Sequence, residues 1–158
     1  MKKNFSGLPL RKGVGIILLN DENKVFVAKR IDNPKNFWQM PQGGIDEGEN
    51  HYEAALRELK EETSIVSVEF IHEIDKKLTY ILPDHLIGII WRGRFKGQTQ
   101  KWFVMRFTGS ESEINIKTKK PEFLAWKWIN LEDLPKIAVK FKLDVYKSLE
   151  QEVSKILN

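Results

Sequence analysis

The chain has 158 residues, of which 26 are Lys or Arg and 22 are Asp or Glu, and 41% of its residues are hydrophobic. This length and balance predict one folded globular domain over residues 1–158 rather than a disordered chain. The absence of cysteine excludes a disulfide scaffold, a thiolate metal site and a cysteine nucleophile. The N-terminus carries no apolar run and residues 14–19 are too few to cross a bilayer, so we expect no signal peptide, no membrane partner and a cytoplasmic protein.

The first half of the chain predicts a hairpin and a helix. Two apolar, β-branched segments, residues 14–19 and 24–30, flank the turn residues between them and predict paired strands. A loop with Pro and Gly follows as far as Gly44. Residues 50–63 are rich in Ala, Leu, Glu and Lys and predict a helix.

The second half of the chain consists mainly of strand-forming residues. β-branched and aromatic side chains predict strands over residues 65–74, 77–82, 86–95, 101–108 and 122–129. Apolar residues at helical spacing predict a helix over residues 141–157. This order of elements predicts an α/β fold in which helices cover a sheet.

The charge is unevenly distributed. Residues 42–62 contain seven acidic and two basic residues, which leaves the rest of the chain with 24 basic and 15 acidic residues and a net charge of +9. A basic surface attracts polyanions, whereas a packed acidic block repels them unless a divalent cation lies between. The alternative is an ordinary solvated acidic helix.

The spacing of the acids favours a metal site. On a helix Glu58, Glu61 and Glu62 share one face, because they lie at i, i+3 and i+4. This face adjoins the apolar face of the helix, and Arg57 precedes Glu61 by four residues, so it can offset part of the repulsion. Clustered carboxylates of this kind suit a hard cation such as Mg²⁺.

The residues from Gly43 to Ile65 form a longer pattern: Gly43, Glu49 six residues later, and then Arg57-Glu58-Leu59-Lys60-Glu61-Glu62-Thr63-Ser64-Ile65. It resembles the signature of the Nudix hydrolases, G-x5-E-x7-R-E-U-x-E-E-x-G-U, in which U is aliphatic. Eight of the nine fixed positions match, and Ser64 stands where that family has Gly. A glycine there ends the helix in a left-handed conformation. Serine is therefore expected either to cost about 1 kcal/mol of stability or to shift the end of the helix, in both cases without touching the chemistry.

The resemblance implies a Nudix α/β/α sandwich around a mixed sheet. It also implies Mg²⁺- or Mn²⁺-dependent hydrolysis of a nucleoside diphosphate linked to another group. Glu58, Glu61 and Glu62 would hold the metal, Arg57 would orient them through ion pairs, and Glu49 would support the set. Such cations neutralise phosphate oxygens and lower the pKa of bound water, while a carboxylate takes its proton.

Further segments narrow the resemblance to RNA pyrophosphohydrolases and the related diadenosine tetraphosphate hydrolases. They are Trp38-Gln39-Met40-Pro41-Gln42-Gly43-Gly44, Gly97-Gln98-Thr99-Gln100-Lys101-Trp102-Phe103, Pro121-Glu122-Phe123 with Trp126-Lys127-Trp128, and Phe141-Lys142-Leu143-Asp144-Val145-Tyr146. Leu143 replaces an Arg of that pattern, and Leu10-Arg11-Lys12 departs from the usual Y-R-P but keeps Arg11.

This closer resemblance implies roles outside the helix. Glu122 would be a fourth metal ligand or the general base. Arg11, Arg30 and Lys142 would contact substrate phosphates beside Gly43 and Gly44, and Phe141 would stack on the first base. For Phe141 a place in the core, and for Lys142 a place on the free surface, are the alternatives.

One basic, aromatic stretch favours a polymeric substrate. Five basic residues occur without an intervening acid among aromatic residues, and strand alternation would place several of them on one sheet face: Arg92, Arg94, Lys96, Lys101 and Arg106. Basic and aromatic side chains together suit single-stranded nucleic acid, although a solvated edge would have the same composition.

The leading hypothesis is an RNA 5′-pyrophosphohydrolase that converts 5′-triphosphate ends to monophosphates in mRNA decay. The close alternative is hydrolysis of diadenosine tetraphosphate to ATP and AMP. A module that binds 5′-phosphorylated RNA or nucleotides without cutting them is the non-enzymatic alternative, which the presence of Glu58, Glu61 and Glu62 disfavours. The residues identify no protein partner.

Overall fold

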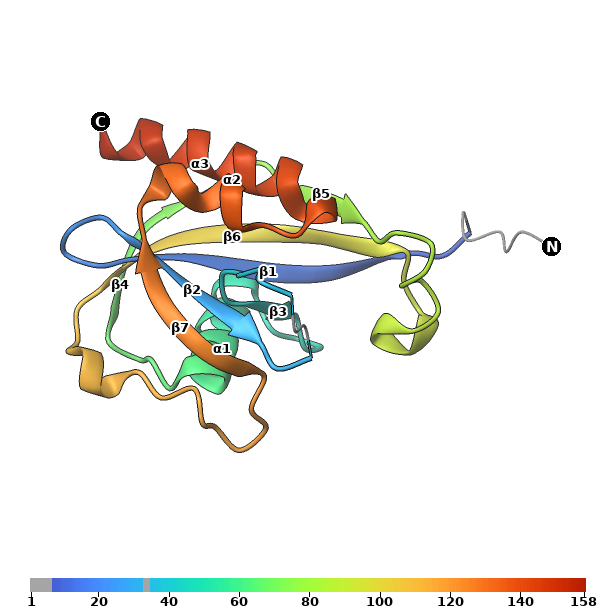
Figure 1. The fold of residues 1–158 in the computed structure, drawn as a ribbon, viewed down its shortest axis with the longest axis horizontal. Helices are drawn as coiled ribbons and strands as arrows, with labels where there is room; N and C mark the ends of the chain where they lie inside the picture. The colour runs from blue at the N-terminus through green and yellow to red at the C-terminus, as the bar shows by residue number, and fades with distance from the viewer. Residues whose placement is uncertain (1–6, 33–34) are drawn as a thin grey trace.

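A mixed β-sheet of seven strands forms the centre of the computed structural model, which describes residues 7–32 and 35–158 (Figure 1). The expectation of no signal peptide concerns residues 1–5, which lie outside the described residues. The strands run in the order β4-β6-β1-β2-β7, with β3 paired to β1 and β5 to β6. They are β1 (Leu10–Leu19), β2 (Val25–Arg30), β3 (Gln42–Gly44), β4 (Val68–Glu73), β5 (Leu78–Ile81), β6 (Gly97–Phe107) and β7 (Phe123–Ile129).

The two longest strands, β1 and β6, pair in parallel over their whole length, from Leu10 opposite Gly97 to Leu19 opposite Arg106. The remaining strand pairs are antiparallel. The short strand β3 pairs with the first half of β1, with Gly43 opposite Val14. This pairing fixes the glycine pair against the centre of the sheet.

Helices cover both faces of the sheet (Figure 1). One face packs against α1, and the other packs against α2 and α3. The helices are α1 (His51–Thr63), α2 (Leu134–Ile137) and α3 (Leu143–Leu157), with short 3₁₀ turns η1 (Ile90–Gly93), η2 (Glu111–Glu113), η3 (Leu131–Asp133) and η4 (Lys140–Lys142). None of the helices in the described ranges is long and apolar enough to cross a membrane.

Strand alternation divides the buried residues into two cores. Ile17 and Leu19 face Val145, Leu149 and other residues of α3, while Ile16 and Leu18 face Leu59 and its neighbours on α1. Each successive residue of β1 therefore contributes to the opposite core, and the predicted α/β/α sandwich is confirmed. Burial on both faces also explains why residues 14–19 of this strand are apolar without interruption.

Most of the predicted elements are present with shifted ends. The hairpin closes with Leu19 opposite Val25, as predicted, but β1 begins four residues earlier than the apolar run because it pairs with β6. The structure adds β3 and the one-turn helix α2, where no regular element was predicted.

The predicted strand over residues 86–95 is wrong. Backbone N–H groups of Leu86 and Ile87 bond to the Pro83 carbonyl, and those of Ile89 and Ile90 bond to Leu86, so local turns replace a ladder. Gly88 and Gly93 have positive φ angles of 94° and 73°. These left-handed glycines turn the chain back on itself. The segment therefore does not form the strand that its β-branched composition predicts.

The basic residues of this region therefore do not share one sheet face. Arg92 lies in the turn η1, and Lys101 and Arg106 lie on β6 an odd number of residues apart, so they face opposite sides. Lys101 lies 3.9 Å from Glu73, and Arg106 bonds to the Asn20 carbonyl. The single basic stripe predicted for residues 92–106 is wrong.

Candidate acidic site on helix α1

Helix α1 is held at both ends by local contacts. The side chain of Asn50 accepts a hydrogen bond from the Glu53 N–H at 2.8 Å, which caps the N-terminus. At the C-terminus Ser64 adopts φ 66°, and its N–H donates to the Lys60 carbonyl. The predicted left-handed end is confirmed, although serine rather than glycine occupies it.

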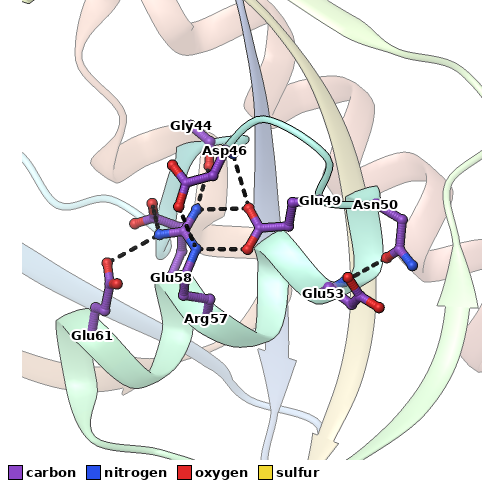
Figure 2. Close-up of polar contacts among 8 residues, drawn as sticks. All are labelled: Gly44, Asp46, Glu49, Asn50, Glu53, Arg57, Glu58 and Glu61. Carbon is purple, nitrogen blue, oxygen red and sulfur yellow. Dashed lines mark hydrogen bonds and ion pairs between the residues drawn. The ribbon is translucent and has the colours of Figure 1, made fainter.

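Arg57 is the centre of the acidic cluster (Figure 2). Its guanidinium donates two hydrogen bonds to Glu49, at 2.8 and 3.0 Å, and one each to Glu58 at 2.9 Å and Glu61 at 3.1 Å. Asp46 lies 3.3 Å from Arg57 Nε, a contact the sequence analysis did not anticipate. The Arg57 guanidinium thus contacts carboxylates of the helix and of the loop before it.

The glycine pair brings backbone against these side chains. A Cβ atom at Gly43 would collide with the Glu58 carboxyl group, so glycine lets this carboxyl group lie directly against β3. The carbonyl of Gly44 accepts a hydrogen bond from Arg57 Nη2 at 2.9 Å. The loop of the signature and its helix are therefore locked together through Arg57 and Glu58.

Three carboxylates interact at the inner side of α1. Burial raises the pKa of Glu62 well above its usual value, and the charges of Glu122 and Glu58 raise it further. Burial also raises the pKa of Glu58, which Arg57 opposes. Glu122 lies directly before β7, and its carbonyl accepts a hydrogen bond from the Ile31 N–H at 2.9 Å. Arg30 lies 3.8 Å from the Glu122 carboxylate.

The carboxylate oxygens of this arrangement are suitable ligands for a divalent cation. Glu62 is buried, yet its Oε2 atom has no hydrogen-bond partner among the described residues, and the mutual repulsion of Glu58, Glu62 and Glu122 is relieved by positive charge. Within residues 7–32 and 35–158, no three acidic or histidine side chains already stand at ligand spacing. Glu58 and Glu61 instead turn their oxygens toward Arg57.

A second group of predicted residues forms a cationic and aromatic wall. The Nζ atom of Lys142 lies 5.3 Å from the centroid of the Tyr80 ring, and the Phe141 ring lies 5.7 Å from the same ring. Lys142 is buried, and this burial, with the charge of Arg30, lowers its pKa to about 8. Phe141 is half-buried and packs against the core, so the core alternative holds in part, whereas stacking on a base stays a prediction. A free surface position for Lys142 is wrong.

Arg11 is held by a buried network of amide side chains. Its Nη1 donates to Gln98 Oε1 at 2.8 Å, and Gln98 Nε2 donates to the Tyr80 hydroxyl at 2.8 Å. Gln42 accepts from Gln100 at 2.6 Å. No role was predicted for these glutamines from the sequence. The signal was present, since Gln98 and Gln100 are two residues apart on one strand and must share a face.

Comparison with known proteins places this site in a family. Residues 9–149 match the family model described as NUDIX domain. The chain is 61% identical to the RNA pyrophosphohydrolase of Pelagibacter ubique over 158 residues, which is 100% of both chains. It is 48% identical to the RNA pyrophosphohydrolase of Sphingopyxis alaskensis over 147 residues, 92% of this chain and 93% of the relative.

Solved structures share the fold. The dihydroneopterin triphosphate pyrophosphohydrolase of E. coli superposes with a TM-score of 0.71 at 21% identity, covering 91% of this chain and 99% of that one. An Ap4A hydrolase of C. elegans superposes with a TM-score of 0.64 at 23% identity, covering 94% and 99%. Nudix hydrolases generally use divalent metal ions. With the signature on α1, the sandwich around a mixed sheet and these relatives, the chain belongs to the Nudix family.

Proposed function

We propose that this protein is an RNA 5′-pyrophosphohydrolase, which converts a 5′-triphosphate end to a monophosphate and releases pyrophosphate or successive phosphates. The observation that carries the proposal is the set of three interacting carboxylates, Glu58, Glu62 and Glu122, in which the buried Oε2 atom of Glu62 has no hydrogen-bond partner within the described part of the chain. The names of the two closely similar relatives support the RNA substrate. In this proposal residues 1–158 act as one domain in cytoplasmic mRNA decay.

In the proposed site Glu58, Glu61, Glu62 and Glu122 hold Mg²⁺ or Mn²⁺. When bound, such cations neutralise phosphate oxygens and lower the pKa of water. Either Glu58 or Glu122 accepts the proton of the attacking water, and no covalent enzyme intermediate forms.

Arg57 and Glu49 act as positioning residues. The paired hydrogen bonds between them fix the guanidinium, which in turn fixes the carboxylates of Glu58 and Glu61. Partners of this kind orient ligands that would otherwise rotate freely. Gly43 and Gly44 let the backbone approach without a Cβ atom in the way.

In this proposal the substrate phosphates contact the positively charged side chains around this cluster. Arg30 lies beside Glu122, and Arg11 lies next to Gly44. The charges of Lys142 and Glu62 interact. Guanidinium groups bind phosphate oxygens in pairs, which fixes the orientation of the polyphosphate. Phe141 supplies a half-buried ring on which the first base stacks.

Hydrolysis of a dinucleoside polyphosphate is the second candidate, because the same carboxylates serve both reactions. The name of the C. elegans neighbour, Ap4A hydrolase, supports this chemistry on the shared fold. A module that only binds 5′-phosphorylated ends is disfavoured, since binding alone does not need Glu58, Glu61 and Glu62 together.

The test is a paired assay with Mg²⁺ and, separately, Mn²⁺. We expect kcat/KM for a 5′-triphosphate RNA oligonucleotide to exceed that for diadenosine tetraphosphate by about tenfold or more, which corresponds to about 1.4 kcal/mol of transition-state binding. The reverse preference would make the dinucleotide the substrate.

Glu58→Gln tests the mechanism. Loss of the carboxylate should lower kcat by about 100-fold or more while the protein stays folded. Glu53→Gln is the matched control, because Glu53 lies exposed on the first turn of the same helix. Full activity of Glu58→Gln would contradict the mechanism.

A further inference from the structure

The carboxylate of Asp32 is bonded to Arg30, one of the side chains proposed to contact the substrate phosphates. Arg30 Nε donates a hydrogen bond to Asp32 Oδ1 at 2.8 Å, and Nη2 donates to Oδ2 at 2.9 Å. Two parallel bonds of this kind fix both the position and the plane of a guanidinium group. The hydrogen bonds from Arg30 also lower the pKa of Asp32, so the carboxylate is ionised at neutral pH.

The rest of the Arg30 guanidinium lies toward the acidic site. Its Nη1 atom lies 3.8 Å from Oε2 of Glu122. The hydrogen bonds to Asp32 are the largest cause of the raised pKa of Arg30, and the charges of Glu122 and Glu62 add to them. The bonds to Asp32 involve Nε and one N–H of Nη2, so the edge formed by Nη1 and the second N–H of Nη2 has the geometry to bind two phosphate oxygens.

The backbone fixes Asp32 relative to Glu122. Arg30 is the last residue of β2 and lies opposite Phe123, after a register shift between Lys29 and Arg30. The N–H of Ile31 then donates to the Glu122 carbonyl at 2.9 Å, so the pairing continues one residue beyond β2. Irregularities of this kind at the end of a strand commonly redirect a side chain beside a functional site.

Arg30 needs such a partner because its other neighbours do not hold it in one place. Burial and the charge of Arg30 lower the pKa of Lys142, so the two cations repel each other. The Arg30 side chain is 34% exposed and that of Asp32 is 67% exposed. An ion pair as exposed as this contributes little to the free energy of unfolding, yet it still restricts the rotamers of a long side chain. Its effect is therefore on the position of the guanidinium rather than on stability.

We propose that Asp32 is a positioning residue, which holds Arg30 so that the Nη1–Nη2 edge of the guanidinium faces the substrate phosphates beside Glu122. This role rests on the proposed function and deepens it, because Asp32 lies outside the signature on α1 and does not itself contact substrate. The negative charge of Asp32 also repels phosphate, which acts in the opposite direction. Solvent and salt screen that repulsion, whereas the two hydrogen bonds act at contact distance, so we expect positioning to prevail.

The first test compares kcat and KM for 5′-triphosphate RNA in Asp32→Ala, Asp32→Glu and Asp21→Ala. Asp21→Ala is the matched control, because Asp21 is an exposed acid in the turn at the other end of β2. We expect Asp32→Ala to raise KM by about five- to tenfold with little change in kcat. Asp32→Glu should recover most of this loss, because glutamate can form the same paired bonds. Thermal unfolding of the variants should stay close to that of the wild type.

A double-mutant cycle with Arg30→Met tests whether Asp32 acts through Arg30. Once the guanidinium is absent, Asp32→Ala should have no further effect on KM, because nothing remains for the carboxylate to hold. An increase in KM that persists in the Arg30→Met background would overturn the positioning role. A KM that is unchanged or lowered in Asp32→Ala alone would overturn it as well, since repulsion would then equal or outweigh positioning.

Binding without turnover separates this role from the proposed function. With Ca²⁺ in place of Mg²⁺, fluorescence anisotropy compares a 5′-triphosphate RNA with its 5′-hydroxyl counterpart. We expect Asp32→Ala to weaken binding of the triphosphate RNA alone. If this difference holds but the wild type hydrolyses neither RNA nor diadenosine tetraphosphate, the proposed function fails and the role of Asp32 stands. If the wild type hydrolyses RNA and Asp32→Ala behaves like Asp21→Ala, only the role of Asp32 fails. A wild-type protein that neither hydrolyses nor prefers the triphosphate end would overturn both.

Discussion

Arg57 and Glu49 are joined by two parallel hydrogen bonds, from Nε to Oε2 at 2.8 Å and from Nη2 to Oε1 at 3.0 Å. Glu49 lies outside helix α1, so this pair ties the loop to the helix that carries Glu58, Glu61 and Glu62. The hydrogen bonds from Arg57 lower the pKa of Glu49 and keep it ionised. The guanidinium thus has a fixed anchor on one side and carboxylates of the acidic face on the other.

Replacing the guanidinium by an ammonium group should loosen this arrangement. Arg57→Lys keeps the charge but cannot bond Glu49 through two nitrogens and still reach Glu58 and Gly44. We expect kcat to fall by about 10- to 100-fold, as for other residues that orient ligands, with KM for RNA little changed. Steady-state kinetics with Mg²⁺ would measure this, and an unchanged kcat would show that the pair is only structural.

The buried carboxyl of Glu62 should make stability depend on pH in the absence of metal. Its pKa is raised in the folded protein, so the folded state binds more protons than the unfolded state, and stability falls as pH rises from the unfolded carboxyl pKa toward the folded one. Glu62→Gln removes this loss. With EDTA present, the variant should match the wild type near pH 4 and become increasingly more stable toward pH 8.

Denaturant unfolding across this pH range checks the prediction. Glu53→Gln, an exposed change on the same helix, is the control and should show no growing difference. A constant offset between Glu62→Gln and the wild type at all pH values would contradict the assigned pKa shift.

Lys142 should produce the opposite pH dependence in the alkaline range. Burial lowers its pKa to about 8, so the charged form is penalised in the folded state below that pH, and the penalty disappears as pH rises toward the unfolded value. Lys142→Met should therefore stabilise the protein at pH 7, by at most about 3 kcal/mol, with the difference shrinking by pH 10. Activity on RNA should fall, because a proposed phosphate contact is removed.

The left-handed end of helix α1 predicts a simple stability order. Ser64 adopts φ 66°, which glycine accepts without strain, and its hydroxyl donates to the Asn115 carbonyl at 2.9 Å. Ser64→Ala keeps the backbone strain of the positive φ and loses the hydrogen bond. Ser64→Gly also loses the hydrogen bond, but it removes the backbone strain. We expect Ser64→Gly to be more stable than Ser64→Ala by about 1 kcal/mol, measured by thermal unfolding. The two variants should have equal kcat.

Features that depend on neighbours along the chain could be predicted from the amino-acid sequence. The carboxylates of α1 share a face because helix geometry is local, and the end of the helix at Ser64 follows from the same pattern. The central strands were predictable because β1 is apolar on both faces and needs no special partner to be identified. The resemblance to the signature also predicted Arg57 as the residue that orients the carboxylates of α1 and Glu49 as a supporting carboxylate. The direct pairing of Arg57 with Glu49 was found only in the structure.

Contacts and burial that involve residues distant in the chain became known from the three-dimensional structure. Glu122 approaches Glu62 because β7 pairs with β2, and the burial that shifts the pKa of Glu62 and Lys142 comes from packing between elements far apart in sequence. Residues 86–95 have strand-like composition, yet local turns at Gly88 and Gly93 prevail, and none of the strands in the described ranges pairs with this segment. Burial and pairing are properties of the whole chain, so local composition cannot predict them.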